Sequence, residues 1–177
     1  YSGTGSAQSI NGGKYDGCIE FNGSYSSGTA IEIPSFGTTF QNNYSVSSWF
    51  KLHSYAANNS SPYYGLNTIF THFTDYYGWI AVNGTNSSAK LRYYTEHLSS
   101  APWGYGIEST TSIALNTWYH FVCTKSSTTG MKIYINGSLE TTESAATQNH
   151  NAMSSYSSAF GIYGSISGNN HSMMDGL

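Results

Sequence analysis

Nine carboxylate side chains are the first candidates for catalysis in this 177-residue chain. Enzymes that hydrolyse glycosidic bonds place two carboxyl groups about 5–9 Å apart, one on each side of the bond. No two of these acids stand at positions i and i+2, the spacing that puts both side chains on one face of a strand. The nearest pair, Glu140 and Glu143, follows a hairpin signal, so we interpret both as residues of a solvated sheet edge. The acids are Asp16, Glu20, Glu32, Asp75, Glu96, Glu108, Glu140, Glu143 and Asp175.

Other catalytic patterns are absent from the sequence as well. It contains no G-x-S-x-G turn for a nucleophilic serine, no H-E-x-x-H zinc motif and no phosphate-binding P-loop. The six histidines stand apart from one another, and we interpret His120 as a structural hydrogen-bonding residue of a strand. The sequence therefore predicts that the chain is not an enzyme.

Aromatic side chains offer binding chemistry instead, because the chain contains 16 Tyr and four Trp. A rigid ring can stack on the apolar C–H face of a sugar while nearby amides bind the sugar hydroxyls. We expect turn aromatics to contact ligand, although they could also pack on the fold or touch a neighbouring subunit. The predicted ligand surface consists of Tyr76, Tyr77, Trp79, Trp103 and Tyr105, with Asn83 as a polar partner. Strand aromatics are expected to fill the core, and these are Trp49, Trp118, Phe121 and Tyr134.

The charge of the chain excludes two classes of partner. Only six residues are Lys or Arg, and the formal net charge is −3. Such a surface cannot neutralise many phosphates, so nucleic-acid binding is not expected. No apolar stretch is long enough for a membrane span, so membrane insertion is not expected either.

The two cysteines, Cys18 and Cys123, leave two interpretations open. They form no metal-binding pattern. In an oxidising compartment they could form a disulfide, which requires Cα atoms within about 7 Å. The alternative is two small buried thiols.

Short runs with a period of two predict an all-β chain with no convincing helix. Alternating or apolar segments occur at residues 18–24, 29–34, 44–52, 67–73, 78–84, 90–95, 117–125, 131–140 and 159–167. Asn136-Gly137 is the strongest hairpin signal. Residues 1–17 form a polar, Gly-rich leader, and residues 98–106 are predicted to form a loop. Strands at this spacing favour one antiparallel two-sheet sandwich over residues 1–177.

The order of these motifs resembles the concanavalin A-like superfamily in its laminin G-like branch. The matching pieces are Phe21-Asn22-Gly23, the strand of residues 44–51 with Trp49, the Trp118-Tyr119-His120-Phe121 run and the hairpin of residues 132–137. The resemblance implies a jelly-roll sandwich. Some relatives carry a structural calcium ion, which the resemblance keeps open here, although Asn22 replaces the usual Asp and the chain has only three Asp residues.

The resemblance also suggests that the paired terminal strands of the family are incomplete. The chain ends at Met174-Asp175-Gly176-Leu177, where the final strand of the family would begin. We therefore expect a segment of a longer chain, with an open sheet edge near Leu177 and Cys18 that invites another strand. The alternative is that Ser6 to Ile10 folds back and closes this edge.

These observations predict a non-catalytic recognition module that binds carbohydrate or glycoprotein. An adhesin or a phage or virion protein is the expected parent, at an extracellular, cell-surface or virion-surface location. The alternative is a structural or decoration domain of a capsid, fibre or surface assembly, in contact with other subunits and without a small ligand.

Overall fold

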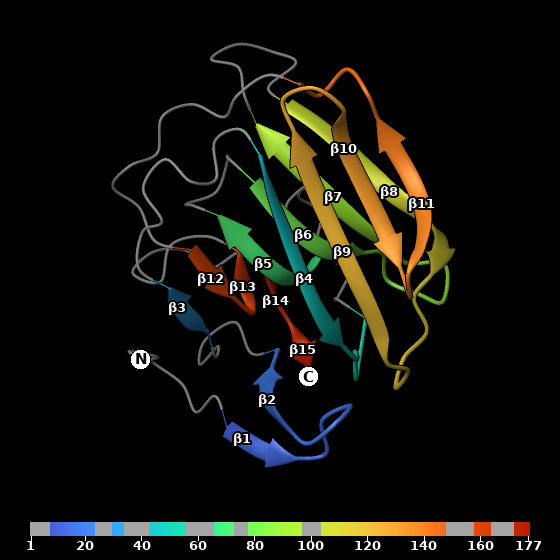
Figure 1. The fold of residues 1–177 in the computed structure, drawn as a ribbon. Coiled ribbons are helices and arrows are strands. Elements are labelled where there is room, and N and C mark those ends of the chain that lie inside the picture. Colours follow the sequence, from blue (N-terminus) through green and yellow to red (C-terminus); the bar gives the residue numbers. More distant parts are fainter. Residues whose placement is uncertain are drawn as a thin grey trace.

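The computed structural model describes residues 8–23, 30–33, 43–55, 66–72, 78–96, 104–147, 158–163 and 172–177. All regular elements in these residues are β-strands (Figure 1). Within the same residues, no helix is long and apolar enough to cross a membrane.

The front sheet in Figure 1 contains four long antiparallel strands. Their order is β11 (Ser138–Glu143), β10 (Gly130–Ile135), β9 (Tyr119–Ser126) and β4 (Tyr44–Phe50). Three more strands continue this layer beyond β4, in the order β15 (Asp175–Gly176), β2 (Gly17–Asn22) and β1 (Gln8–Asn11). The two groups are joined because Lys51 and Leu177 exchange two backbone hydrogen bonds of 2.8 Å.

The back sheet has six strands and lies behind the front sheet. Their order is β3 (Ile31–Ile33), β12 (Ser158–Phe160), β5 (Leu66–His72), β6 (Gly78–Asn83), β7 (Lys90–Glu96) and β8 (Gly104–Ser112). A two-stranded piece, β13 (Ile162–Tyr163) with β14 (Ser172–Met173), completes the described elements. The predicted all-β, antiparallel two-sheet jelly-roll is confirmed.

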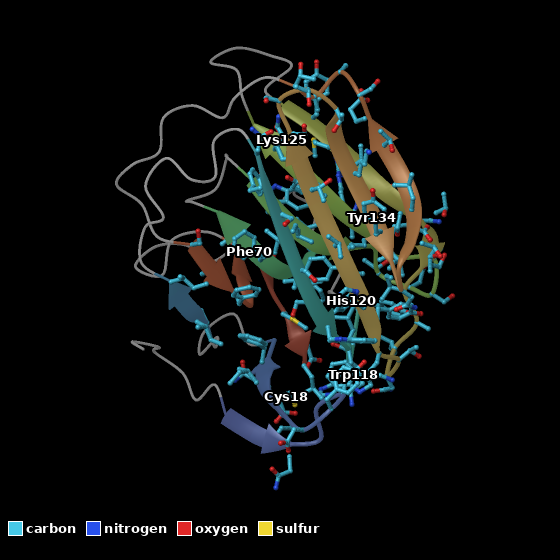
Figure 2. All side chains as sticks on the ribbon, viewed as in Figure 1. Cys18, Phe70, Trp118, His120, Lys125 and Tyr134 are labelled. Atoms are coloured by element: carbon cyan, nitrogen blue, oxygen red, sulfur yellow. The ribbon has the colours of Figure 1, made fainter. Side chains whose placement is uncertain are left out.

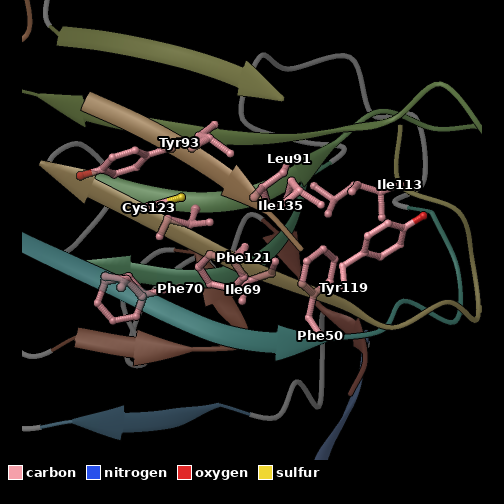
Figure 3. Close-up of a cluster of buried hydrophobic side chains, with 14 of the residues drawn as sticks. Phe50, Ile69, Phe70, Leu91, Tyr93, Ile113, Tyr119, Phe121, Cys123 and Ile135 are labelled. Carbon is pink, nitrogen blue, oxygen red and sulfur yellow. The ribbon is translucent and has the colours of Figure 1, made fainter. Parts of the chain in front are cut away.

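The core lies between the two sheets and follows the period of two. Along β9, Tyr119, Phe121 and Cys123 are buried, whereas the residues between them are half-buried on the outer face. Figure 3 shows Phe121 and its neighbours filling the space between the layers. Phe50 of β4 packs edge-on against Phe121, with ring centroids 5.9 Å apart. The prediction that Phe121 belongs to the core is confirmed.

The predicted Asn136-Gly137 hairpin joins β10 to β11. Ile135 pairs with Ser138 across a two-residue turn, and Asn136 and Gly137 have φ angles of 50° and 85°. Two successive positive φ angles define the turn that matches strand twist, and Asn followed by Gly adopts it at little cost.

One long strand was missed. Residues 98–106 were predicted to be a loop, but Gly104 begins β8, which runs to Ser112 and pairs with β7. Its sequence contains Gly and Ser, which weaken the strand signal, and its pairing with β7 overrides that local preference.

The two cysteines do not form a disulfide, so the bridge considered from the sequence is not made. Both thiols are free: Cys18 is half-buried on β2, and Cys123 is fully buried on β9. Burial raises the pKa of the Cys123 thiol well above its ordinary value. A neutral, inaccessible thiol of this kind is chemically inert.

The open edge expected near Leu177 and Cys18 is partly closed. β15 pairs with Phe21 and Asn22 of β2 on one side, and the segment after β4 pairs with Asp175 and Leu177 on the other. β1 folds back on β2 and places Ile10 opposite Cys18. The alternative that the leader closes this edge is therefore supported by the pairing of β1.

Glu140 connects the two sheets at the β8–β11 edge, where a merely solvated side chain was expected. Its carboxylate accepts hydrogen bonds from the backbone N–H groups of Thr110 and Thr111, at 2.9 and 2.8 Å, and from both hydroxyls. Partial burial works to raise the pKa of Glu140, but these hydrogen bonds outweigh it and hold the pKa below its ordinary value.

Replacing Glu140 with Gln is expected to lower the free energy of unfolding by about 1 kcal/mol at neutral pH, because a charged acceptor near solvent is lost. A carboxylate with a lowered folded-state pKa stabilises the fold above its unfolded pKa, and this contribution disappears as pH falls through the folded-state pKa. Urea unfolding of both proteins should thus show a difference in unfolding free energy that is constant above about pH 4.5, the ordinary Glu pKa, and becomes smaller at lower pH. A difference that does not depend on pH would contradict the role of the charge.

Candidate functional site

Trp79, Asn83 and Tyr105, the three residues of the predicted ligand surface that the structure describes, do not lie on one surface. Tyr76, Tyr77 and Trp103 lie outside the described residues. Trp79 and Asn83 lie on the outer face of the back sheet, as alternation along β6 requires. Tyr105 packs against the main core on the opposite face.

The environments of Trp79 and Asn83 explain why they do not form a ligand surface together with Tyr105. Trp79 is only 6% exposed and stacks on Tyr94 with a centroid distance of 5.5 Å. The Asn83 amide donates a 3.1 Å hydrogen bond to Glu108 Oε1. A buried indole offers no free face to a sugar, so Trp79 is not a stacking platform.

A groove on the front layer brings other aromatic residues together. Its volume is about 570 Å³. Trp49 and Trp118, which the sequence assigned to the core, line this groove and are half-buried, so that assignment is wrong for both. Tyr134, also assigned to the core, is half-buried on β10, where it alternates with the buried Ile133 and Ile135. Figure 2 shows Trp118, His120 and Tyr134 along the front sheet, with Cys18 below them. The lining residues are Lys14, Tyr15, Asp16, Gly17, Cys18, Ile19, Phe21, Ile31, Ser47, Ser48, Trp49, Trp118, His120, Phe160 and Leu177.

Strand pairing positions the central side chains of the groove. Trp49 on β4 lies directly opposite His120 on β9, and their ring centroids are 5.2 Å apart. Ser47 lies two residues before Trp49 on the same face, and its hydroxyl is 2.9 Å from His120 Nε2. The backbone N–H of His120 donates a 2.9 Å hydrogen bond to the Asn136 side chain. The hairpin at Asn136 thus holds the strand that carries His120.

The turn between β1 and β2 covers one side of the groove. A 2.6 Å hydrogen bond from the Gly13 N–H to the Asp16 carbonyl closes this turn. Tyr15 at its tip is 80% exposed and meets Trp49 edge-on, with a centroid distance of 5.6 Å. Together Tyr15, Trp49, Trp118 and His120 form what we call the aromatic rim.

Two lysines lie over the tryptophans of the rim. Lys14 Nζ is 5.3 Å from the ring centroid of Trp49, and Lys51 Nζ is 5.1 Å from that of Trp118. An ammonium group at this distance is attracted to the ring face, by about 0.5–1 kcal/mol at an exposed site. Each ammonium group therefore adds a hydrogen-bond donor beside one ring.

The floor of the groove is apolar and comes from both layers. Phe21 is buried, and Ile19, Ile31 and Phe160 are half-buried and pack against the main core. Leu177 lies at the end of β15 and also lines the groove. The groove therefore combines a polar, aromatic rim with an apolar floor.

The described residues of the rim form neither a serine-hydrolase triad nor a cluster of metal-binding side chains. A serine hydrolase needs a third group that orients the histidine, and in the described residues no hydrogen bond joins the His120 ring to a carboxylate. Calcium needs six to eight oxygen ligands. Among the described side chains, no three His, Cys, Asp or Glu residues form a group that could hold a metal ion, so these side chains provide no carboxylate cluster for calcium.

The sequence contains a pattern that indicates this rim, although the prediction placed Trp49 and Trp118 in the core. Trp49 alternates with Phe50, and Trp118 and His120 alternate with Tyr119 and Phe121. Since adjacent strand residues point to opposite faces, only one ring of each adjacent pair can enter the core. The other ring must lie on the outer face, and Trp49 and His120 face each other there.

We compared the sequence and the fold with those of known proteins. The model of one family, described as the concanavalin A-like lectin/glucanases superfamily, matches residues 24–176. No curated protein matches the sequence.

Several solved structures share the fold at low sequence identity. The native heptameric SAP-like pentraxin from Limulus polyphemus is similar, with a TM-score of 0.64 and 18% identity, covering 89% of this chain and 70% of the pentraxin. The binding domain of Paraclostridial Mosquitocidal Protein 1 has a TM-score of 0.64 and 15% identity, covering 96% of this chain and 41% of that one. Mouse laminin alpha1 chain domains LG4-5 have a TM-score of 0.54 and 12% identity, with coverages of 91% and 40%. This chain thus spans about two fifths of the length of the last two structures.

The family match covers most of the chain, and the similar solved structures share its fold with TM-scores of 0.54 to 0.64. The chain belongs to the concanavalin A-like lectin/glucanases superfamily.

Proposed function

We propose that this domain is a non-catalytic recognition module that binds carbohydrate or glycoprotein through the aromatic rim. The observation that carries the proposal is the position of the rings. Trp49, Trp118 and His120 are half-buried on the outer face of the front sheet, and Tyr15 projects beside them. Aromatic rings that lie outside the core and gather on one surface are typical of binding sites.

The chemistry of the rim suits a sugar. An indole face can take the apolar side of a pyranose ring, and it loses little conformational freedom on binding. The Ser47 hydroxyl, the His120 imidazole and the lysine ammonium groups lie close enough to the rings to bind hydroxyl groups. A few polar groups beside an apolar platform give such a site its orientation and specificity.

The related structures support binding as the general role, but they do not identify the ligand. One similar structure is the binding domain of Paraclostridial Mosquitocidal Protein 1, and another is the binding domain of Botulinum Neurotoxin DC in complex with SialylT. This chain covers only 41% and 38% of those two chains, so their ligands are not assigned to the shared part. By the same reasoning from resemblance, we propose an extracellular, cell-surface or virion-surface setting.

A glycan array with the isolated domain tests the proposal. We expect one class of glycan to bind, and Trp118→Ala to weaken that binding at least tenfold, about 1.4 kcal/mol, because the platform is lost. Leu139→Ala is the matched control, since Leu139 is 55% exposed on β11 and does not line the groove.

Two results would contradict the proposal. Binding that survives in Trp118→Ala but not in Leu139→Ala would move the site away from the rim. An array with no bound glycan, together with a stable assembly of domains in solution, would instead support the structural or decoration role.

A further inference from the structure

Two of the six Lys and Arg residues of the chain lie over the rings of the aromatic rim. Lys14 comes from the turn between β1 and β2, and Lys51 directly follows β4. The other four belong to β7, β9 and β10, and they are Lys90, Arg92, Lys125 and Lys132. A chain with a formal net charge of −3 therefore places two positive charges beside the same groove.

No carboxylate neutralises either of these lysines in the part of the chain that the structure describes. Glu20 and Asp175, the acids on the neighbouring strands β2 and β15, are directed to His53, whose Nδ1 lies 3.9 and 3.8 Å from their oxygens. Asp16 lines the groove but forms no ion pair with a described residue. Both ammonium groups thus remain available to an anion from outside the chain.

Strand pairing fixes the position of Lys51 beside the groove. The register of β4 with β9, continued by one step, places Lys51 opposite Trp118. The backbone N–H and C=O of Lys51 are both bonded to Leu177 at 2.8 Å, so the side chain is the part that can move. Burial raises the pKa of the Cys18 thiol, which lines the groove, and the charge of Lys51 opposes that shift. The field of Lys51 therefore extends into the groove.

The lysines occupy ring faces that a stacked sugar would use. The Lys51 ammonium group, 5.1 Å from the ring centroid of Trp118, lies where the C–H face of a pyranose would lie. A neutral sugar that stacks there displaces the lysine, and losing one exposed cation–π contact lowers its affinity about two- to fivefold. A sugar with an anionic group recovers this loss, because the displaced ammonium group can donate a charge-assisted hydrogen bond to the anion.

We propose that the aromatic rim selects acidic glycans, in which a sugar carries a carboxylate or sulfate group, and that Lys51 determines this preference. This inference rests on the proposed function, since it names the ligand class of the same rim. In the complex the sugar ring stacks on Trp118, and the Lys51 ammonium group leaves the ring face to bind the anion. Lys14 plays the same part over Trp49. Selection arises because one side chain attracts acidic sugars and obstructs neutral ones.

An array of matched glycan pairs, probed with the 177-residue chain, tests this selection. Each pair contains an acidic oligosaccharide and its neutral parent: sialyllactose with lactose, oligogalacturonate with oligogalactose, and sulfated with unsulfated N-acetyllactosamine. We expect Lys51→Gln to weaken binding of the acidic members at least about fivefold, and to leave the neutral members unchanged or up to about threefold tighter. Raising the salt concentration from about 50 to about 500 mM should weaken binding of the acidic members only.

Lys132→Gln is the matched control for the charge of the chain. Lys132 lies on the outer face of the same sheet, between the buried Met131 and Ile133, and does not line the groove. We expect this variant to bind both members of each pair as the unchanged chain does, and Lys51→Arg to retain the acidic preference because it retains the charge.

The outcomes distinguish a failure of the selection from a failure of glycan binding. Equal affinity for acidic and neutral members, or equal losses in Lys51→Gln and Lys132→Gln, would overturn the selection and leave glycan binding by the rim intact. An array with no bound member, or binding that persists in Trp118→Ala, would overturn the proposed function and the selection with it. Acidic preference in the carboxylate pairs alone, or in the sulfate pair alone, supports the selection and identifies the anion.

Discussion

Replacing Phe121 with Ala is expected to lower the free energy of unfolding by about 3–5 kcal/mol. The side chain is fully buried at the centre of β9, between the two sheets. It meets the ring of Phe50 from β4, and Figure 3 shows Ile69 of the back sheet beside it. Removing the ring leaves a cavity that the neighbouring side chains on two rigid sheets can close only in part. The variant therefore loses the free energy of burying the ring and also bears the cost of the remaining cavity.

Urea unfolding monitored by Trp fluorescence measures this change, and Val122→Ala is the matched control. Val122 is the next residue on β9 and lies half-buried on the outer face. We expect its truncation to cost less than about 1 kcal/mol. Equal costs at the two positions would mean that the outer face is as closely packed as the core, which would contradict an exposed aromatic rim on the same face.

The central strands and the hairpin between β10 and β11 could be predicted from the sequence because local signals agree with the tertiary structure. Alternation marked β4 and β9, and Asn136-Gly137 fixed the turn between β10 and β11. In these segments the period, the strand-forming residues and the turn chemistry all favour the same structure, which is the condition for reliable inference.

The aromatic rim could not be predicted as readily, because a strand with rings on both faces does not reveal which face is covered. Trp49 and Phe50 are both suited to a core, but only Phe50 is fully buried. Tyr15 presents a second difficulty. It reaches Trp49 only because β1 and β2 bring the leader turn beside β4, and this long-range placement has no local sequence signature.

Two described residues of the predicted ligand surface, Trp79 and Tyr105, lie apart for a related reason. Turn proximity in sequence placed Trp79 and Tyr105 together, but the register of β6, β7 and β8 puts them on opposite faces of the back sheet. Tyr94 pairs with Gly106, so Tyr105, one residue earlier, points to the core. A shift of one residue reverses the face of a strand residue, and turns alone do not fix that register.

Replacing Gly161 with Ala is the second substitution with a large expected effect, because it acts on the floor of the groove. Gly161 lies between β12 and β13 with a φ angle of 83°, which disfavours a residue with a Cβ. Its N–H donates to the Ile69 carbonyl at 3.0 Å, and its own carbonyl accepts from Met174 at 3.1 Å, so the backbone cannot easily move. A Cβ here would lie 2.2 Å from Cδ1 of Phe21.

The expected cost of Gly161→Ala is about 2–4 kcal/mol of unfolding free energy, from backbone strain and from displacement of the Phe21 ring. Chemical denaturation of Gly161→Ala, Phe21→Ala and the double variant separates these two causes. If the clash with Phe21 contributes, the cost of Gly161→Ala falls by at least about 1 kcal/mol when Phe21 is already Ala, because the new methyl group then enters vacated space. Strict additivity would assign the whole cost to the backbone and would mean that Phe21 yields freely. In that case the Phe21 ring would shift at little cost, and the floor of the groove would adapt to the shape of a bound group.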